Sequence, residues 1–573
     1  MKKLSLLLAI APLLMASACA SRPFRPTAYP TVAEPDTARA YGDFMVARVA
    51  ALTNDPETAS RYYAASIGTA PEDMDVAERA VYSALMAGDF GLAAGVARRA
   101  DAGATEAGLV PLTLAADALV HGRAQGAIDI LKAQQLTFFH QMIALNLEAW
   151  SQLERGNLAE AVALAGSNRT GDRRLDNATN HIVGLLQVAA EDDAAAAETF
   201  AALWAAGARL AVGAEAYAEL LAARGDRDEA LDILTTFRTE VSYNASLEAL
   251  RLRIERGDKI EPKRLTLREG AALSFQLPAA VLLQNTSNSL ATPYLVIALA
   301  LDADLHQARV LWVQALLLGE RPQEAIRVLR EIPDASPFYA AARGQLANLL
   351  HIEGRDEDAL RVAAEALAAR PDRGLKLQIA GLYRALKREA DAEAILSEVM
   401  VADAAVGQDD WRVHFLRGAA RERQVKWEGA EADLKRALEL DPDNATVLNY
   451  LGYSWIDRGI NLKEGLALIQ QAVALEPESG QIVDSLGWAH YRLGEYEQAV
   501  EFLERAVTLL PADAVLNDHL GDAYWKAGRR NEAGFQWKRA LKLDPPAEDR
   551  ARIQQKLLGG FDREPAPGAA VAR

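Results

Sequence analysis

Small residues recur at intervals of 34 positions along most of this chain. In the N-terminal part they are Ala59, Ala93, Ala127, Ala161 and Ala195. Near the other end, Leu486-Gly487, Ala499 and Pro511 recur 34 positions later as Leu520-Gly521, Ala533 and Pro545. A period of this length indicates tandem helix-turn-helix units, each of which buries its apolar face against its neighbours. The sequence therefore predicts an all-α fold, a superhelical solenoid.

Composition agrees with close helix packing and argues against a nucleic-acid partner. Hydrophobic residues make up 50% of the 573 residues and aromatic residues only 6%, which suits helix faces lined with Ala and Leu. The formal net charge is −17. Binding to phosphates needs clustered Lys and Arg, so the acidic balance favours protein partners over nucleic acid.

The only cysteine, Cys19, lies where a lipid would be attached. Lys2 and Lys3 precede an apolar run from Leu4 to Met15, and Ala16-Ser17-Ala18 precede the thiol. This order is typical of a bacterial signal peptide. The placement of the thiol resembles the lipobox of bacterial lipoproteins, which implies acylation of Cys19 after cleavage before it. An ordinary secreted protein with an accidental cysteine is the alternative interpretation.

The residue after Cys19 bears on the location of the protein. Ala20 stands where the resemblance would require Asp for retention in the inner membrane. We therefore expect the inner leaflet of the outer membrane, facing the periplasm. After residue 19 no apolar run approaches the roughly 20 residues of a membrane span, so the lipid is the expected anchor.

The last four units carry the clearest repeat. Their second helices end before prolines spaced 35, 34 and 34 residues apart, and each unit has paired small residues in its second helix. These prolines are Pro442, Pro477, Pro511 and Pro545. With Leu-Gly followed by an aromatic residue, as in Leu520-Gly521 and Tyr524, the pattern resembles the tetratricopeptide repeat. We count about 13 recognisable units and two degraded ones, a number estimated from this period.

These features divide the chain into seven expected segments. Residues 258–292 interrupt the period, and either a joint between two arrays or a poorly matched helix pair would explain this. The expected segments are a lipoprotein signal peptide (1–18), a lipidated Pro-rich tether (19–38), an N-terminal array (39–257), an irregular joint (258–292), a C-terminal array (293–545), a capping helix (546–558) and a disordered tail (559–573).

Residues that could form a reaction centre do not cluster in the sequence. The eight histidines are scattered without His-Glu-x-x-His spacing, and no second cysteine is present to share a metal. Gly452-Tyr453-Ser454 begins like a nucleophile elbow but lacks the second glycine and lies inside a repeat. We predict no catalysis, no cofactor and no metal site.

A binding surface is better supported than a reaction centre. In each unit, one face of the first helix points away from the second helix and is expected to line the concave side of the solenoid. On this face we predict a partner-binding set of Asn449, Tyr453, Asp484, Trp488, Tyr491, Asp518, Asp522 and Trp525. Aromatic rings beside carboxylates suit an extended segment with apolar and basic residues. The alternative is that the rings pack against the next repeat and the acids are solvated.

A closer resemblance covers the last repeats. Leu448-Asn449-Tyr450-Leu451-Gly452-Tyr453 and its two later counterparts, together with the lipobox, are similar to large tetratricopeptide lipoproteins of proteobacterial outer membranes. The resemblance implies a scaffold that binds a periplasmic carboxyl-terminal processing protease and delivers cell-wall hydrolases to it. The alternative is an assembly factor for a secretin, a polysaccharide exporter or an outer-membrane protein complex. The sequence does not indicate an oligomeric state.

Overall fold

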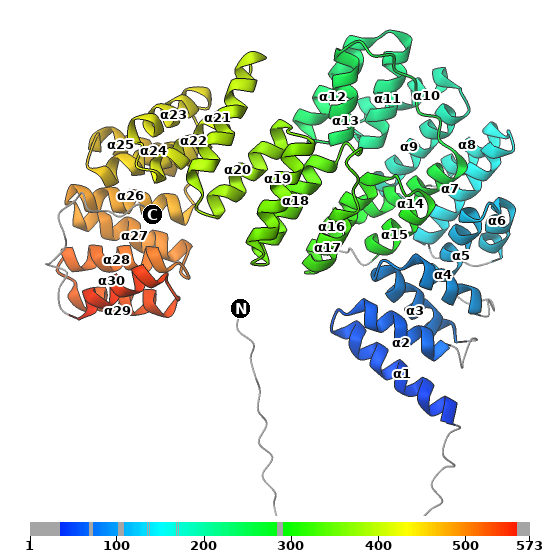
Figure 1. The fold of residues 1–573 in the computed structure, drawn as a ribbon, viewed down its shortest axis with the longest axis horizontal. Coiled ribbons are helices and arrows are strands. Elements are labelled where there is room, and N and C mark those ends of the chain that lie inside the picture. Colours follow the sequence, from blue (N-terminus) through cyan, green and yellow to red (C-terminus); the bar gives the residue numbers. More distant parts are fainter. Residues whose placement is uncertain are drawn as a thin grey trace, which may run out of the picture. The chain divides into compact units, whose positions relative to one another are not determined.

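The computed structural model describes residues 35–558, apart from 68–72, 101–107, 134–135, 137, 168, 170 and 284–289. Thirty α-helices account for the regular structure of these residues, and consecutive helices pair as antiparallel hairpins (Figure 1). The predicted all-α repeat fold is confirmed. The expected signal peptide, Cys19 and most of the tether lie outside the described residues, as does the expected tail. Among the described residues, no helix combines the length and the apolar character that crossing a bilayer requires.

The chain divides into two compact units. Unit 1 holds the residues up to Ala230 and residues 260–305, and unit 2 holds residues 231–259 and those from His306 on. Helix α12 (Arg227–Glu240) spans this division. The helices of unit 1 are α1 (Pro35–Leu52), α2 (Pro56–Ser66), α3 (Met74–Met86), α4 (Phe90–Arg99), α5 (Leu109–Val120), α6 (Ala124–Lys132), α7 (Phe138–Glu154), α8 (Leu158–Ser167), α9 (Arg173–Ala189), α10 (Asp193–Ala205), α11 (Ala211–Arg224), α14 (Leu267–Leu283) and α15 (Ala291–Leu301).

Unit 2 begins within α12, continues with α13 and a series of hairpins, and ends with the single helix α30. Its helices are α13 (Ala245–Glu255), α16 (His306–Leu318), α17 (Pro322–Arg330), α18 (Tyr339–Ile352), α19 (Asp356–Ala369), α20 (Arg373–Ala385), α21 (Glu389–Ala405), α22 (Trp411–Arg423), α23 (Trp427–Leu440), α24 (Ala445–Arg458), α25 (Leu462–Leu475), α26 (Gly480–Leu493), α27 (Tyr496–Leu509), α28 (Ala514–Lys526), α29 (Arg530–Lys542) and α30 (Ala547–Leu557).

The periodic alanines lie where the two helices of a hairpin approach each other. Ala59, Ala93 and Ala161 are fully buried in second helices of unit 1, and Ala499 and Ala533 are fully buried in unit 2. A methyl group at this point lets the paired helices pack closely, as ridges-into-grooves packing requires. The sequence period thus marks the core of each repeat.

One periodic alanine differs from the expectation. Ala195 is only half-buried, and its neighbour Ala196 is fully buried in α10. The contact position therefore shifts by one residue in this repeat. Glu191, five residues before Ala196, adopts a left-handed conformation with φ of 63°, as Gly156 does five residues before Ala161, so the turn keeps its geometry and the whole turn and second helix are displaced by one residue.

The turns and exits of the repeats explain the remaining periodic residues. Gly88 and Gly156, five residues before periodic alanines, adopt φ of 79° and 83°, which favours glycine. In unit 2, Pro442 and Pro511 lie two residues after the last residues of α23 and α27, where proline prevents the helix from continuing. The 35-residue interval before Pro477 is accommodated at Asn461, which has φ of 45° at the start of α25.

Residues 258–292, expected as an irregular joint, contain a long buried helix. Residues 258–266 have no regular structure, but α14 follows for 17 residues and is buried from Gly270 to Ala279. It pairs with α15, which is buried from Ala291 to Ala298. The pair packs on the first helices of unit 1, with α14 on α7 and α9 and α15 on α3 and α5. The broken period therefore reflects two helices that are buried on several sides.

Close approach fixes α14 on the N-terminal repeats. A side chain at Gly270 would lie 2.2 Å from the ring of Trp150 on α7, and Trp150 is 1% exposed. Arg264, ahead of α14, forms an ion pair with Asp193 on α10 and donates a hydrogen bond to the carbonyl of Val188. The first helices of these repeats are thus covered by the chain's own α14 and α15, and this face of unit 1 offers little room for another protein.

Candidate protein-interaction surface

The predicted partner-binding residues occupy the first helices of three consecutive repeats, α24, α26 and α28. The structure brings those of α26 and α28 together, but in a more buried setting than expected. Four of the eight residues are buried, namely Asp484, Tyr491, Asp518 and Asp522. The other four, Asn449, Tyr453, Trp488 and Trp525, are half-buried. In the last two repeats the three predicted acids and Tyr491 are therefore buried, whereas both tryptophans keep part of their surface exposed.

Helix α28 covers the predicted residues of α26. Nδ1 of His519 lies 2.9 Å from the carboxylate of Asp484. The ring of Trp488 stacks on His519 with centroids 4.2 Å apart, and on Tyr491 with centroids 4.7 Å apart. Burial lowers the pKa of His519, but the carboxylate of Asp484 outweighs it, and the net shift of this pKa is upward.

Helix α30 covers the predicted residues of α28 with two cations. Nζ of Lys556 lies 2.9 Å from Asp518 and 2.7 Å from Asp522, and Arg552 donates to Asp518 over 2.8 Å. Nε1 of Trp537 donates to the same carboxylate of Asp522. Burial raises the pKa of Asp522 to about 6, although Lys556 opposes this shift. These carboxylates are bound inside the protein because α30 occupies the position that the first helix of a further repeat would take. Whether the eight residues bind a partner stays a prediction.

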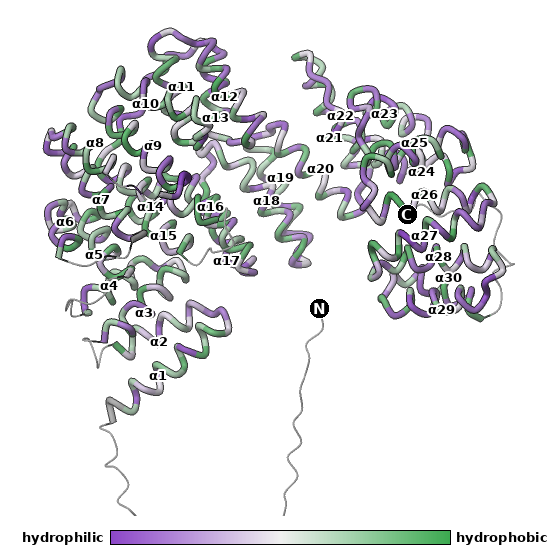
Figure 2. The backbone as a smooth tube through the Cα atoms, turned by 180° about the vertical axis from the view of Figure 1, so that it is seen from behind, coloured by the Kyte–Doolittle hydropathy of each residue, from purple (hydrophilic) through white to green (hydrophobic). Residues whose placement is uncertain are grey.

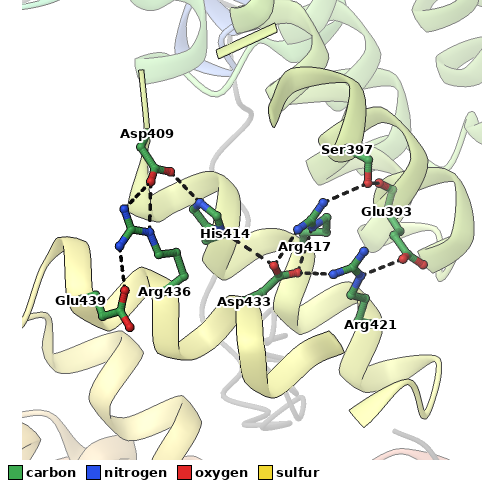
Figure 3. A network of polar contacts seen from close by, with 9 residues as sticks. All are labelled: Glu393, Ser397, Asp409, His414, Arg417, Arg421, Asp433, Arg436 and Glu439. Carbon is green, nitrogen blue, oxygen red and sulfur yellow. Dashed lines mark hydrogen bonds and ion pairs between the residues drawn. The ribbon is translucent and has the colours of Figure 1, made fainter. Parts of the chain in front are cut away.

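A polar network stabilises the repeats immediately before these helices (Figure 3). Asp433 of α23 is 4% exposed and accepts hydrogen bonds from Arg417 and Arg421 of α22, at 2.7 Å and 2.9 Å. Arg421 also donates to Glu393 of α21 over 2.8 Å. Burial raises the pKa of Glu393, but hydrogen bonds from Lys426, Arg421 and Gln424 lower it to about 2. The network therefore joins three successive helices and fixes the orientation of α22.

Two aromatic residues of α22 contribute to a surface pocket that sequence reasoning missed. The pocket has a volume of about 600 Å³ and lies between the start of α22, the loop before α24 and the end of α25. We call it the Trp411 pocket. Its apolar lining comes from Trp411, Phe415, Leu416, Ala445 and Leu475, and its polar lining from Arg412, Asp441, Asp443, Asn444, Thr446 and Glu476.

The aromatic wall of the Trp411 pocket is held in place by neighbouring rings. Trp411 and Phe415 lie four residues apart on one face of α22, with ring centroids 6.5 Å apart. Phe415 meets Tyr450 of α24 edge-to-face at 5.4 Å. The guanidinium of Arg412 lies 4.9 Å from the centroid of Trp411. Opposite this wall, Leu475 keeps 44% of its surface exposed, so the apolar pocket is open to solvent.

Uncompensated acids surround the Trp411 pocket. Asp443 and Glu476 are exposed and Asp441 is half-buried. Asp441 accepts a hydrogen bond from Asn444 and Asp443 accepts one from Gln471, but within residues 35–558, as far as these are described, none of the three carboxylates forms an ion pair. A pocket of this kind can accept an apolar side chain while the carboxylates attract a neighbouring Lys or Arg.

Groups suited to metal chemistry do not converge in the structure. In the described part of the chain, no three His, Cys, Asp or Glu side chains are arranged so that they could hold a metal ion. Among the buried acids described above, Asp433, Asp518 and Asp522 pair with Lys or Arg of neighbouring helices, and Asp484 pairs with His519.

Comparisons with known proteins agree on the repeat type. The family model for the tetratricopeptide repeat matches residues 484–513. The TPR repeat-containing protein PA4667 of Pseudomonas aeruginosa is 28% identical over 194 residues, which make up 32% of this chain and 32% of that protein. The match thus spans about a third of the length of this relative.

Two solved structures are also similar to this chain. A tetratricopeptide repeat protein from Parabacteroides merdae is 16% identical, with a TM-score of 0.38, and the alignment covers 44% of this chain and 99% of that one. The protein TTC0263 from Thermus thermophilus is 20% identical, with a TM-score of 0.29, and the alignment covers 32% of this chain and 98% of that one. The helical hairpins and the matched repeat show that the chain is an all-α tetratricopeptide-repeat solenoid. Arrays of this type generally bind proteins.

Proposed function

We propose that this chain is a lipid-anchored scaffold of the periplasm that binds protein partners through unit 2. The observation that carries the proposal is the Trp411 pocket, an open aromatic pocket surrounded by carboxylates that have no ion-pair partner among the described residues. Four first helices of unit 1, namely α3, α5, α7 and α9, are already covered by α14 and α15, which makes that face a less suitable receptor. The lipid anchor rests on Cys19 and the residues before it.

The chemistry of the Trp411 pocket indicates the kind of segment that it binds. Trp411 and Phe415 would contact an aromatic or branched apolar side chain, and buried aromatic anchors often contribute most to binding at interfaces. Asp441, Asp443 and Glu476 would attract a Lys or Arg beside it. We therefore propose an extended or helical partner segment in which an apolar residue is followed by a cation.

The resemblance noted in the sequence suggests the partners themselves. It supports a carboxyl-terminal processing protease and the cell-wall hydrolases on which that protease acts. A scaffold on the membrane increases the effective concentration of both proteins without a catalytic residue of its own. In this proposal the repeats position the enzyme and its substrate on one surface.

Substitutions in the Trp411 pocket test the binding site. We expect Trp411→Ala combined with Leu475→Asp to lower the amount of the main partner recovered from envelope extracts at least about 10-fold, since a central aromatic anchor is lost. The matched control is Phe535→Ala, which removes an aromatic side chain that is 69% exposed on α29. Mass spectrometry of the recovered proteins identifies the partner. A secretin or an exporter would replace the protease proposal, and equal recovery with all variants would refute the site.

Removal of the thiol tests the anchor. We expect Cys19→Ser to lower the membrane-bound fraction of the protein at least about 10-fold, because the lipid chains supply most of the membrane affinity in this proposal. Flotation of envelope fractions in a density gradient measures this fraction. An unchanged membrane-bound fraction of the variant would show that a different part of the chain anchors the protein.

A further inference from the structure

The first helix of unit 1 exposes an apolar face at the end of the repeat stack (Figure 1). Five large apolar residues of α1 point to solvent, and hydrophobic residues follow its C-terminal half in Figure 2. The exposed fractions are 67% for Tyr41, 42% for Met45, 43% for Val46, 57% for Val49 and 80% for Leu52. Their spacing follows the helical period, so that these side chains form one continuous stripe.

Packing on α2 explains why this stripe faces outward. Phe44 contacts Tyr63 edge-to-face with centroids 5.7 Å apart, and Ala47 and Ala50 are buried. At about 100° per residue, these positions lie on the side of α1 opposite Met45 and Val49. The fold therefore fixes one face of α1 in the core, and an equally apolar face has no neighbour among the residues that the structure describes. The terminal helix of a repeat stack normally presents a polar outer face.

Cations flank the apolar stripe. Arg39 and Arg48 are exposed on its two sides, and in the described part of the chain neither forms an ion pair. The acid of α1 with a described side chain, Asp43, lies towards the core side of the helix and is half-buried. This pattern differs from the rest of a chain whose net charge is −17.

We propose that the exposed face of α1 lies on an anionic lipid surface. A helix with an apolar face between basic residues binds in the plane of the membrane interface, where its apolar side chains contact acyl chains and its arginines contact phosphates. The position of α1 in the chain agrees with this, since about 16 residues separate it from Cys19 and can span at most roughly 50 Å. The argument from the distance between Cys19 and α1 rests on the proposed lipid anchor.

Charge favours a membrane over a second copy of the chain. If two copies paired through this face, Arg39 and Arg48 of each would meet a stripe on which the described side chains of α1 present no exposed carboxylate. Anionic headgroups supply the counter-charge that such pairing lacks. Contact of α1 with the bilayer would orient the first repeats at the membrane, whereas the lipid on Cys19 alone would leave them free to rotate.

Vesicle binding without the lipid tests this proposal independently of acylation. We use the chain from residue 19 on with Cys19→Ser, and vesicles of phosphatidylethanolamine and phosphatidylglycerol in a ratio of 3 to 1. We expect this protein to co-float with the vesicles, and Met45→Asp combined with Val49→Asp to lower the partition coefficient at least about 10-fold. Replacing both arginines by glutamine is expected to lower binding to these vesicles and to abolish the preference for them over phosphatidylcholine.

The control variant changes an equally exposed apolar residue elsewhere. Ile352→Asp alters a side chain that is 74% exposed at the end of α18, and we expect it to bind vesicles like the parent protein. Equal flotation of the parent and the α1 variant, or no flotation of either, would overturn the proposal. Analytical ultracentrifugation tests the alternative of a second copy. If the parent protein forms a dimer, does not bind vesicles, and loses the dimer on Met45→Asp with Val49→Asp, the face pairs with a second copy instead. The anchor is tested separately by combining Cys19→Ser with Met45→Asp and Val49→Asp in cells. If this variant stays in the membrane fraction as the parent protein does, the anchor is refuted, and the vesicle result is unaffected because it is measured without acylation.

Discussion

Replacement of Lys556 by alanine is expected to destabilise the last repeats by about 3 to 5 kcal/mol at pH 7.5, because it leaves two buried carboxylates without their shared cation. Asp518 and Asp522 are 1% and 3% exposed, so both carboxylates depend on protein groups for their counter-charge. The loss is local, since each repeat of a solenoid depends mainly on its neighbours. Hydrogen exchange of α26 to α30 therefore measures it better than a global melting temperature.

The pH dependence of this effect follows from Asp522. Its pKa is raised to about 6 in the folded protein, above the ordinary value of 3.8, so that the folded state binds more protons than the unfolded state between these values. The stability that this group contributes is present below about pH 4 and is lost as the pH rises through 6. The raised pKa of His519 acts in the same direction above its ordinary value of 6.5. We expect the Lys556→Ala defect to shrink at pH 5, where Asp522 is protonated.

Two variants control this experiment. Lys542→Ala removes an exposed lysine of α29 and should leave hydrogen exchange unchanged. Asp518→Asn with Asp522→Asn in the Lys556→Ala background should restore part of the lost protection by removing the uncompensated charges. If Lys556→Ala protein exchanges like Lys542→Ala protein at pH 7.5, the buried ion cluster does not hold α30 on α28.

Replacement of Trp150 by alanine is expected to destabilise unit 1 by about 3 to 5 kcal/mol, because it leaves a cavity between α7 and α14. Trp150 is 1% exposed and contacts the backbone of Gly270. We expect amides of α14 and α15 to lose protection from hydrogen exchange more than those of α3 and α5. Gly270→Leu should act in the same way, since its side chain would overlap the tryptophan ring.

Trp204 provides the matched control for Trp150. It lies in α10 of the same unit and is half-buried, and the guanidinium of Arg209 lies 4.8 Å from the centroid of its ring. Trp204→Ala should leave the exchange of α14 and α15 unchanged. A similar loss of protection in both variants would show that α14 does not depend on the Trp150 contact.

The sequence predicts the repeats well because their signals are local and periodic. The periodic alanines, such as Ala93, Ala161 and Ala533, each mark a contact between the two helices of one hairpin, and Pro511 marks a helix end. Both kinds of signal are therefore independent of distant parts of the chain. Helices α14 and α15 lack such a signal. They are buried on several sides and therefore show no amphipathic period, and the partner of Gly270 lies in α7, far away in the sequence.

The candidate site was harder to predict for two physical reasons. Helical spacing places Asp518, Asp522 and Trp488 on the expected face. It does not reveal that Lys556 of α30 covers the two acids, or that His519 of α28 covers the predicted residues of α26. The Trp411 pocket is formed by parts of three elements that are separate in the sequence. The pair Trp411 and Phe415 at i and i+4, next to an acidic loop, was the available signal.

Photo-crosslinking from the edge of the Trp411 pocket tests most directly that unit 2 is a receptor for another protein. A photoreactive phenylalanine derivative replaces Arg412, which lines the pocket, or Ala467, which is exposed on α25 outside it, in cells that carry the full chain. We predict a light-dependent protein adduct from position 412 that position 467 does not give, with one protein identified in it by mass spectrometry. Absence of an adduct at 412, or the same adducts from both positions, would contradict the account.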